Sequence, residues 1–138
     1  MRLRKDAKVE LISRVPLFAG CSKGELGKIA SIADEVDLPE GKTLIREGAV
    51  GREFFVLLEG RAGISRKGRS VDTAEKGDFF GEVALVSDAP RNATVTALTP
   101  LRVLVITDRD FRHLLKDSSS IQLKVLQALA QRLPPDQI

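Results

Sequence analysis

The chain reads Glu53-Phe54-Phe55-Val56-Leu57-Leu58-Glu59-Gly60 near its middle. Residues 53–58 form a mostly apolar run of strand length, and Glu59-Gly60 is a turn signal that ends it. Two further β-rich runs, 93–98 and 101–106, are separated by Thr99-Pro100. Runs of this length, bounded by glycine or proline, are typical of strands rather than of helices.

Turn signals recur on both sides of this run, roughly every ten residues. They are Pro39-Glu40-Gly41-Lys42, Glu47-Gly48, the basic tip Arg66-Lys67-Gly68-Arg69, and Glu75-Lys76-Gly77-Asp78. Short strands with glycine-containing turns at this spacing favour an antiparallel roll or barrel over a parallel sheet. We therefore expect about eight short strands over residues 34–107, with Phe54-Phe55 and Phe79-Phe80 in the core.

Helical patterns flank the strands. A short helix is expected over residues 6–14, before Pro16, and Ser22-Lys23-Gly24-Glu25 has the pattern of a capping box. After the strands, Thr107-Asp108-Arg109-Asp110 can cap one helix and Ser118-Ser119-Ser120 can cap another. The apolar stripe of the last helix is Ile121, Val125, Leu126, Leu129 and Leu133, and Pro134-Pro135 stops it.

The predicted fold class is therefore α+β. An antiparallel, jelly-roll-like β-roll over about 34–107 is flanked by helices within about 5–33 and 108–133. With 138 residues the chain suits one domain with its own core, so we expect a single domain over 1–138.

Composition limits the classes of function. The net charge of +3 is mild, and a dedicated nucleic-acid binder usually shows a denser basic face, so no direct binding of nucleic acid is expected. A single cysteine, Cys21, excludes an internal disulfide framework and fits a reducing compartment. No apolar run approaches the length of a membrane span, and no apolar segment follows the charged N-terminal residues, so we expect a cytoplasmic protein.

Two nearby segments carry the chemistry: Phe80-Gly81-Glu82-Val83-Ala84-Leu85 and Pro90-Arg91-Asn92-Ala93-Thr94. A carboxylate accepts hydrogen bonds from ribose hydroxyls but repels a phosphate, whereas an arginine fork pairs with a phosphate. A short helix over about Glu82 to Val86 would point free backbone N–H groups at the same anion. The two segments thus combine a carboxylate suited to a sugar, Glu82, with an arginine suited to a phosphate, Arg91.

These segments, in their β-rich frame, resemble the phosphate-binding cassette of the cyclic nucleotide-binding domain. That family includes the regulatory subunits of cAMP-dependent protein kinase, the catabolite activator protein and cyclic-nucleotide-gated channels. Its cassette reads Phe-Gly-Glu, a variable residue, Ala-Leu, a gap, then Pro-Arg, a variable small residue, Ala, and Ser or Thr. The resemblance covers about residues 10–132. Glu47-Gly48 with the following Gly51, Glu59-Gly60 and Gly77-Asp78 fall where the turns of the family fall.

The resemblance implies a role for each cassette residue. Glu82 would accept from the ribose 2′-hydroxyl, Arg91 would pair with the exocyclic phosphate oxygens, and Gly81 would let the backbone approach the ribose. The backbone N–H groups of Ala84 and Asn92 would complete the phosphate shell, and Thr94 would support the turn or pack beside the ligand. The expected ligand-binding set is Gly81, Glu82, Val83, Ala84, Leu85, Arg91, Asn92, Ala93 and Thr94.

Asn92 departs from the family pattern, which usually has Ala, Ser or Thr after the arginine. In the family a hydroxyl at this position tends to favour cGMP. Because that hydroxyl is missing here, cAMP is the expected ligand and cGMP the alternative. No cofactor is expected besides the nucleotide.

The family also implies a moving C-terminal helix that covers the purine as a lid. Here that helix would span 119–132, with Leu126 and Leu129 as candidate lid residues and a hinge near Lys116 to Ser120. The apolar stripe of the same helix could instead make a homodimer contact. The chain would thus be a regulatory sensor that acts on an effector domain or protein whose identity the sequence does not give.

The same residues also allow other functions. Glu82 and Arg91 could form only a surface ion pair, or the chain could be a structural module of the same fold that has lost or weakened nucleotide binding. A cupin-like metalloenzyme shares the strand pattern but needs a cluster of His and carboxylate ligands, and the chain has one histidine, His113. No catalytic residue and no metal site are predicted, and we expect no enzymatic activity.

Overall fold

The computed structural model describes residues 3–131. The described residues divide into two compact units, a helical unit within 3–32 and 111–131 and a β-unit over 33–110. The single domain expected over the whole chain stays a prediction.

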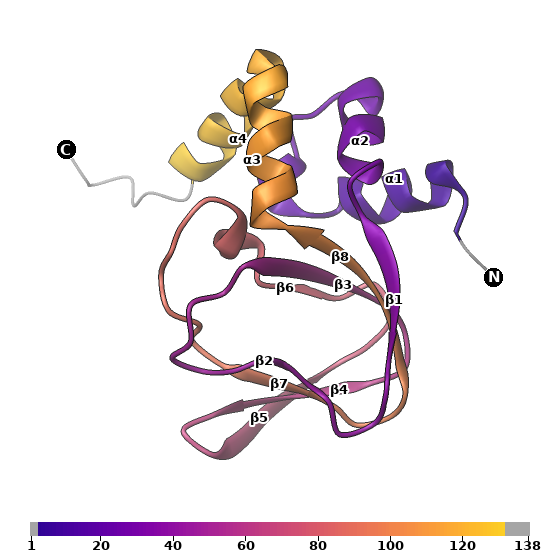
Figure 1. The fold of residues 1–138 in the computed structure, drawn as a ribbon, viewed down its shortest axis with the longest axis vertical. Coiled ribbons are helices and arrows are strands. Elements are labelled where there is room, and N and C mark those ends of the chain that lie inside the picture. Colours follow the sequence, from indigo (N-terminus) through magenta and orange to yellow (C-terminus); the bar gives the residue numbers. More distant parts are fainter. Residues whose placement is uncertain (1–2, 132–138) are drawn as a thin grey trace. The chain divides into compact units, whose positions relative to one another are not determined.

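The β-unit consists of two four-stranded sheets (Figure 1). One sheet has, in order, β1 (Asp34–Leu38), β8 (Leu101–Thr107), β3 (Glu53–Glu59) and β6 (Phe79–Phe80). The other has β2 (Thr43–Ile45), β7 (Thr94–Ala97), β4 (Ala62–Arg66) and β5 (Arg69–Ala74). All strand pairs are antiparallel. Over the described residues, this confirms the predicted antiparallel roll of about eight strands.

Strand β3 lies inside its sheet, which explains its continuous apolar run. It pairs with β8 on one side and with β6 on the other, and residues 54–58 are all buried. A strand whose side chains are covered on both faces has no polar positions to alternate with the apolar ones. The main cluster of buried side chains is Ile45, Phe55, Leu57, Ala62, Ala74, Val95, Ala97, Leu101 and Val103.

The two phenylalanine pairs differ in burial. Phe54 and Phe55 are buried, as expected. Phe79 and Phe80 are only half-buried, because β6 is the two-residue edge strand of its sheet and both side chains line a pocket. Both still pack against core residues: Phe80 contacts the main buried cluster, and the Phe79 and Phe54 ring centroids lie 6.1 Å apart. The predicted core position therefore holds for Phe54 and Phe55 in full and for Phe79 and Phe80 at the margin of the core.

The helical unit contains α1 (Lys5–Ser13), a 3₁₀ turn at Pro16–Phe18, α2 (Lys23–Ala30) and α4 (Ser119–Ala130), while α3 (Asp108–Asp117) begins in the β-unit. The predicted capping box is confirmed: Glu25 N–H donates to Ser22 Oγ over 3.2 Å, and Ser22 N–H donates to Glu25 Oε1 over 2.7 Å. Glu25 also forms an ion pair with Lys124 of α4. The Phe18 and Phe111 rings pack with their centroids 5.7 Å apart.

Both predicted C-terminal caps are confirmed. Thr107 Oγ1 accepts from Asp110 N–H over 3.1 Å at the start of α3, and Ser118 Oγ accepts from Ile121 N–H over 3.4 Å at the start of α4. Ser118 has extended backbone and separates the two helices inside the predicted hinge of 116–120. The predicted helix stop at Pro134-Pro135, and Leu133 of the apolar stripe, lie outside the described residues.

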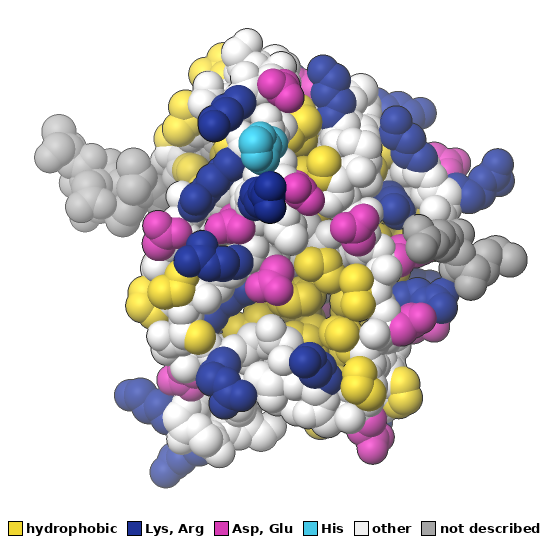
Figure 2. All heavy atoms as spheres, viewed as in Figure 1, with side chains coloured by type: hydrophobic (Ala, Val, Ile, Leu, Met, Phe, Trp, Pro, Cys, Tyr) yellow, Lys and Arg dark blue, Asp and Glu magenta, His cyan; other side chains and the backbone are white. Residues whose placement is uncertain are grey.

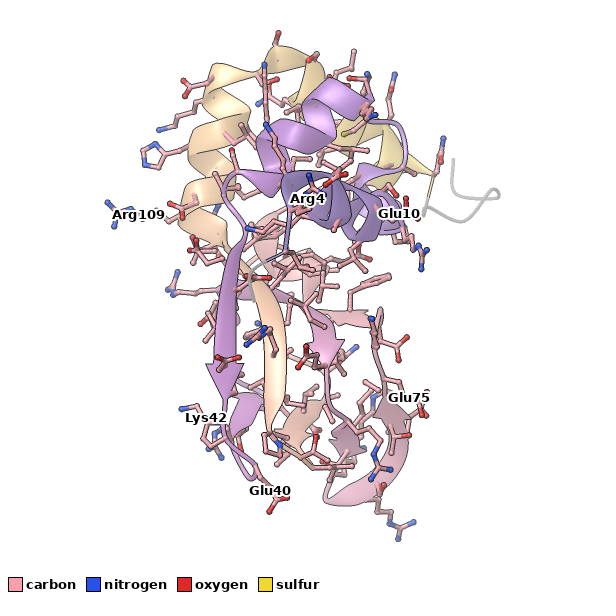
Figure 3. All side chains as sticks on the ribbon, turned by 90° about the vertical axis from the view of Figure 1, so that its right-hand side faces the viewer. Arg4, Glu10, Glu40, Lys42, Glu75 and Arg109 are labelled. Atoms are coloured by element: carbon pink, nitrogen blue, oxygen red, sulfur yellow. The ribbon has the colours of Figure 1, made fainter. Side chains whose placement is uncertain are left out.

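On the face drawn in Figure 2, charged side chains are spread over the surface, and apolar side chains gather in a hollow of the β-unit. Glu40 and Lys42, in the turn between β1 and β2, and Glu75, after β5, are exposed and point outward (Figure 3). In the part of the chain that the structure describes, no helix combines the length and the hydropathy needed to cross a membrane.

Candidate functional site

The two cassette segments meet at one pocket of about 420 Å³ in the β-unit. Strand β6 leads directly into Gly81 and the 3₁₀ turn Glu82–Leu85, whereas residues 91–93 lead into β7 of the other sheet. Each half of the motif is therefore placed by a different sheet. The lining residues are Ile45, Ile64, Arg66, Phe79, Phe80, Gly81, Glu82, Val83, Ala84, Ala89, Pro90, Arg91, Asn92, Ala93 and Val95.

Seven of the nine predicted site residues line this pocket: Gly81, Glu82, Val83, Ala84, Arg91, Asn92 and Ala93. Leu85 and Thr94 are not among the lining residues. Leu85 is fully buried and belongs to the packing beneath the turn. Thr94 Oγ1 accepts from Glu47 N–H over 3.0 Å, so Thr94 supports a neighbouring turn, one of the two roles expected for it.

Gly81 has a left-handed backbone, with φ of 83° and ψ of 17°. A Cβ at this position would lie 2.3 Å from Arg91 Nη1 and 2.9 Å from the Glu53 carbonyl oxygen. Both the backbone conformation and the close approach of Arg91 therefore require glycine. The structure of the pocket itself therefore requires the glycine of the motif, whether or not a ligand is bound.

The short helix expected over 82–86 is a single 3₁₀ turn, Glu82–Leu85. Its Ala84 N–H donates to the Gly81 carbonyl over 3.0 Å. The N–H that the family resemblance assigns to the phosphate is thus engaged within the turn, and a phosphate would have to share it or replace this bond.

Arg91 supplies the positive charge of the cassette. Its Nη2 donates to the Glu53 carbonyl over 2.6 Å, and its Nη1 donates to the Gly81 carbonyl over 3.4 Å. Burial lowers the pKa of the Arg91 guanidinium, and the nearby Glu53 carboxylate partly offsets this shift. The ordinary pKa of a guanidinium lies so far above 7 that Arg91 remains charged at pH 7.

Glu82 supplies the negative charge. Its residue is half-buried, and its Oε2 atom is buried at the wall of the pocket. A carboxylate in this position can accept from a hydroxyl group and repels an anion. Within one cavity, an anionic ligand group is therefore directed to Arg91 and a hydroxyl donor to Glu82.

Sequence reasoning placed Arg66 in the basic tip 66–69 and missed it as a residue of the site. Arg66 lines the pocket, and its Nε donates to the Asn92 carbonyl over 3.2 Å. The available signal was strand alternation: Arg66 and Ile64 stand two residues apart on β4 and so share a face. Because Ile64 faces the pocket, Arg66 does too.

The remaining lining residues are mostly apolar, including Ile45, Ile64, Val95 and Phe80. The pocket can therefore hold a molecule with a negative group, a hydroxyl group and an apolar part. A ribose phosphate that carries a base has these three features. Among residues 3–131 no group of three or more His, Cys, Asp and Glu side chains stands close enough together to hold a metal ion.

Comparison with known proteins gives consistent results. Residues 35–118 match the model of the cyclic nucleotide-binding domain. The cAMP-dependent protein kinase regulatory subunit of Neurospora crassa is 34% identical over 137 residues, which covers 98% of this chain and 36% of that protein. The chain spans 23% to 36% of the length of such curated regulatory subunits.

Solved structures agree with this match. The N-terminal domain of a transcriptional regulator from Streptomyces coelicolor A3(2) superposes with a TM-score of 0.79 at 28% identity, covering 88% of this chain and 91% of that one. A structure of cAMP-bound PfPKA-R (141-441) gives a TM-score of 0.66 at 28% identity, covering 91% of this chain and 47% of that one. With the fold, the cassette and the family match in agreement, the chain belongs to the cyclic nucleotide-binding domain family.

Proposed function

We propose that this chain binds cAMP in the pocket between Glu82 and Arg91 and that it serves as a regulatory domain. The observation that carries the proposal is that a carboxylate and a guanidinium line the same cavity, each placed by its own half of the cassette. The match to kinase regulatory subunits and to a cAMP-bound structure supports cAMP as the nucleotide. cGMP is the alternative ligand, because Asn92 lines the pocket where the family has a small residue or a hydroxyl.

In this proposal each residue has one task. The Arg91 guanidinium neutralises the cyclic phosphate, which carries one negative charge, and the Glu82 carboxylate accepts from the ribose 2′-hydroxyl. Ile45, Ile64 and Val95 give the sugar and base an apolar wall. Nothing in this scheme requires a bond to be made or broken, so the domain is proposed to act by binding and not as an enzyme.

The regulatory output is proposed to pass through the C-terminal helices to an effector domain or protein. Leu126 is 58% exposed and Leu129 is half-buried on α4, so both the lid role and a homodimer contact of this helix stay predictions. A ligand can shift such an element only if it binds one arrangement more tightly than the other. A structural module of the same fold that has lost nucleotide binding is the second candidate function. The retained Glu82 and Arg91 side chains argue against it.

The proposal is tested by removing the Arg91 side chain, which is proposed to bind the phosphate. Arg91→Ala should weaken cAMP binding by about 2–4 kcal/mol, because one partner of a partly buried charge pair is lost. Arg69→Ala is the matched control, since Arg69 is an exposed arginine in the hairpin tip of the same unit. Equilibrium titration of both variants measures the effect, and an affinity of Arg91→Ala equal to that of Arg69→Ala would place the phosphate elsewhere.

A further inference from the structure

We infer that Gly51 is a positioning residue for Arg91: the missing side chain at residue 51 leaves the space in which the guanidinium lies. Gly51 is a buried residue just before β3 and lies outside both cassette segments. The inference rests on the proposed function, because it concerns Arg91, the proposed phosphate-binding residue of the same pocket.

The three atoms nearest to a Cβ added at Gly51 all belong to Arg91. A Cβ added at residue 51 would lie 1.9 Å from Arg91 Nε and 2.1 Å from Arg91 Cζ, and the next nearest atom, Arg91 Nη2, would be 2.6 Å away. Distances this short do not occur between non-bonded atoms. A side chain at residue 51 and the observed position of the Arg91 guanidinium therefore exclude each other.

The backbone of Gly51 does not explain why glycine stands there. Six other glycines, at 41, 48, 60, 68, 77 and 81, have positive φ, and Gly51 is not one of them. An alanine could adopt the Gly51 backbone without the strain it would meet at Gly81. The atoms that a Cβ would meet belong to the far end of a long side chain, so a substitution should displace the guanidinium and leave the fold intact.

The segment around Gly51 holds both ends of Arg91. At the main chain, Arg91 N–H donates to the Ala49 carbonyl and Gly48 N–H donates to the Arg91 carbonyl, each over 2.8 Å. At the side chain, Nη2 donates to the Glu53 carbonyl over 2.6 Å. Residues 48–53 thus fix where the arginine leaves its backbone and where its guanidinium ends, and Gly51 provides the gap between these two anchors.

The position of the guanidinium decides what it can bind. A phosphate is held best when two N–H groups of the planar fork reach two of its oxygens, so a displaced fork loses this geometry while its charge remains. The effect of residue 51 on affinity should therefore run entirely through Arg91. Without the arginine side chain, residue 51 should no longer matter to the ligand.

A double-mutant cycle tests the inference. Gly51→Ala should weaken cAMP binding at least about tenfold, a loss smaller than or equal to that of Arg91→Ala, while the melting temperature of the ligand-free protein changes little. In the Arg91→Ala background, Gly51→Ala should cause no further loss. Gly24→Ala is the matched control, because Gly24 has nothing within 4 Å of an added Cβ and lies in helix α2.

Three results would overturn the inference. The first is wild-type affinity in Gly51→Ala, and the second is an equal loss of affinity with and without the Arg91 side chain. The third is a large fall in melting temperature that Arg91→Ala does not relieve, which would mean that the backbone, and not the arginine, requires glycine. If the wild-type chain bound no cAMP, the proposed function itself would fail, whereas normal wild-type binding with any of these three results would contradict the positioning role alone.

Discussion

At the scale of single residues, Glu82 and Arg91 give the pocket two opposite charges that suit different groups of a ligand. Arg91 is already fixed by the carbonyls of Glu53 and Gly81, so little side-chain freedom remains to be lost when a ligand binds. Glu82 presents a buried oxygen at the pocket wall. The pocket therefore discriminates by charge at one residue and by hydroxyl groups at the other.

The role of Glu82 can be isolated with a paired ligand. Glu82→Gln keeps the size of the side chain but removes its charge, and it should weaken cAMP binding by about 1–3 kcal/mol because a charge-assisted hydrogen bond is lost. Binding of 2′-deoxy-cAMP, which has no 2′-hydroxyl, should fall much less. Calorimetry with both ligands measures the difference, and equal losses for the two would argue against a contact between Glu82 and the ribose.

Asn92 is expected to influence the choice of nucleotide. Its side chain is exposed at the pocket, while its carbonyl accepts from Arg66 Nε. Asn92→Thr introduces the hydroxyl that favours cGMP in the family, so the ratio of cGMP affinity to cAMP affinity should rise several-fold, the size expected of one hydrogen bond. Asn92→Ala serves as the control without a hydroxyl. An unchanged ratio in Asn92→Thr would show that this residue does not select the base.

At the scale of elements, the capping box of α2 also carries an ion pair. The hydrogen bond from Lys124, followed by those from Ser120 and Ser22, lowers the pKa of the Glu25 carboxyl from 4.5 to about 2. Because the folded pKa is depressed, Glu25 stabilises the fold fully above pH 4.5 and loses this contribution as the pH falls toward 2.

Glu25→Gln should therefore lower the melting temperature at neutral pH and flatten its decline in acid. The measurement is the difference in melting temperature between wild type and Glu25→Gln, followed from neutral pH down to about pH 2. This difference should shrink as the acid limit is approached. Glu10→Gln is the control, because Glu10 forms an exposed pair with Arg14 and such pairs contribute little. A constant difference across the range would exclude the proposed titration of Glu25.

Local sequence patterns predicted those elements that depend on contacts between residues close together in the chain. The capping box at Ser22, the cap at Thr107 and the break at Ser118 depend on residues three positions apart, and all three are present. The short helix expected over 82–86 is a single 3₁₀ turn, Glu82–Leu85, which the chain enters through the left-handed backbone of Gly81. Phe79 and Phe80 pack at the margin of the core, and their partial exposure depends on β6 being an edge strand, which no local pattern reveals.

At the scale of the whole molecule, the site depends on contacts between distant segments. The cassette was predicted from two short motifs, and seven of the nine expected residues line one pocket. Gly51 and Glu53, which fix the Arg91 guanidinium, stand about forty residues before it, and Arg66 enters from β4. Only the pairing of strands brings these residues together, so a reading of motifs alone finds the ligand-binding residues and misses those that position them.

The central claim is that the described pocket binds cAMP. The most direct test is calorimetric titration of the wild-type chain with cAMP, with cGMP titrated in parallel. We predict saturable binding of cAMP with one ligand per chain, matching the one cassette in the sequence. The absence of binding heat with both nucleotides at high micromolar concentration would contradict the account.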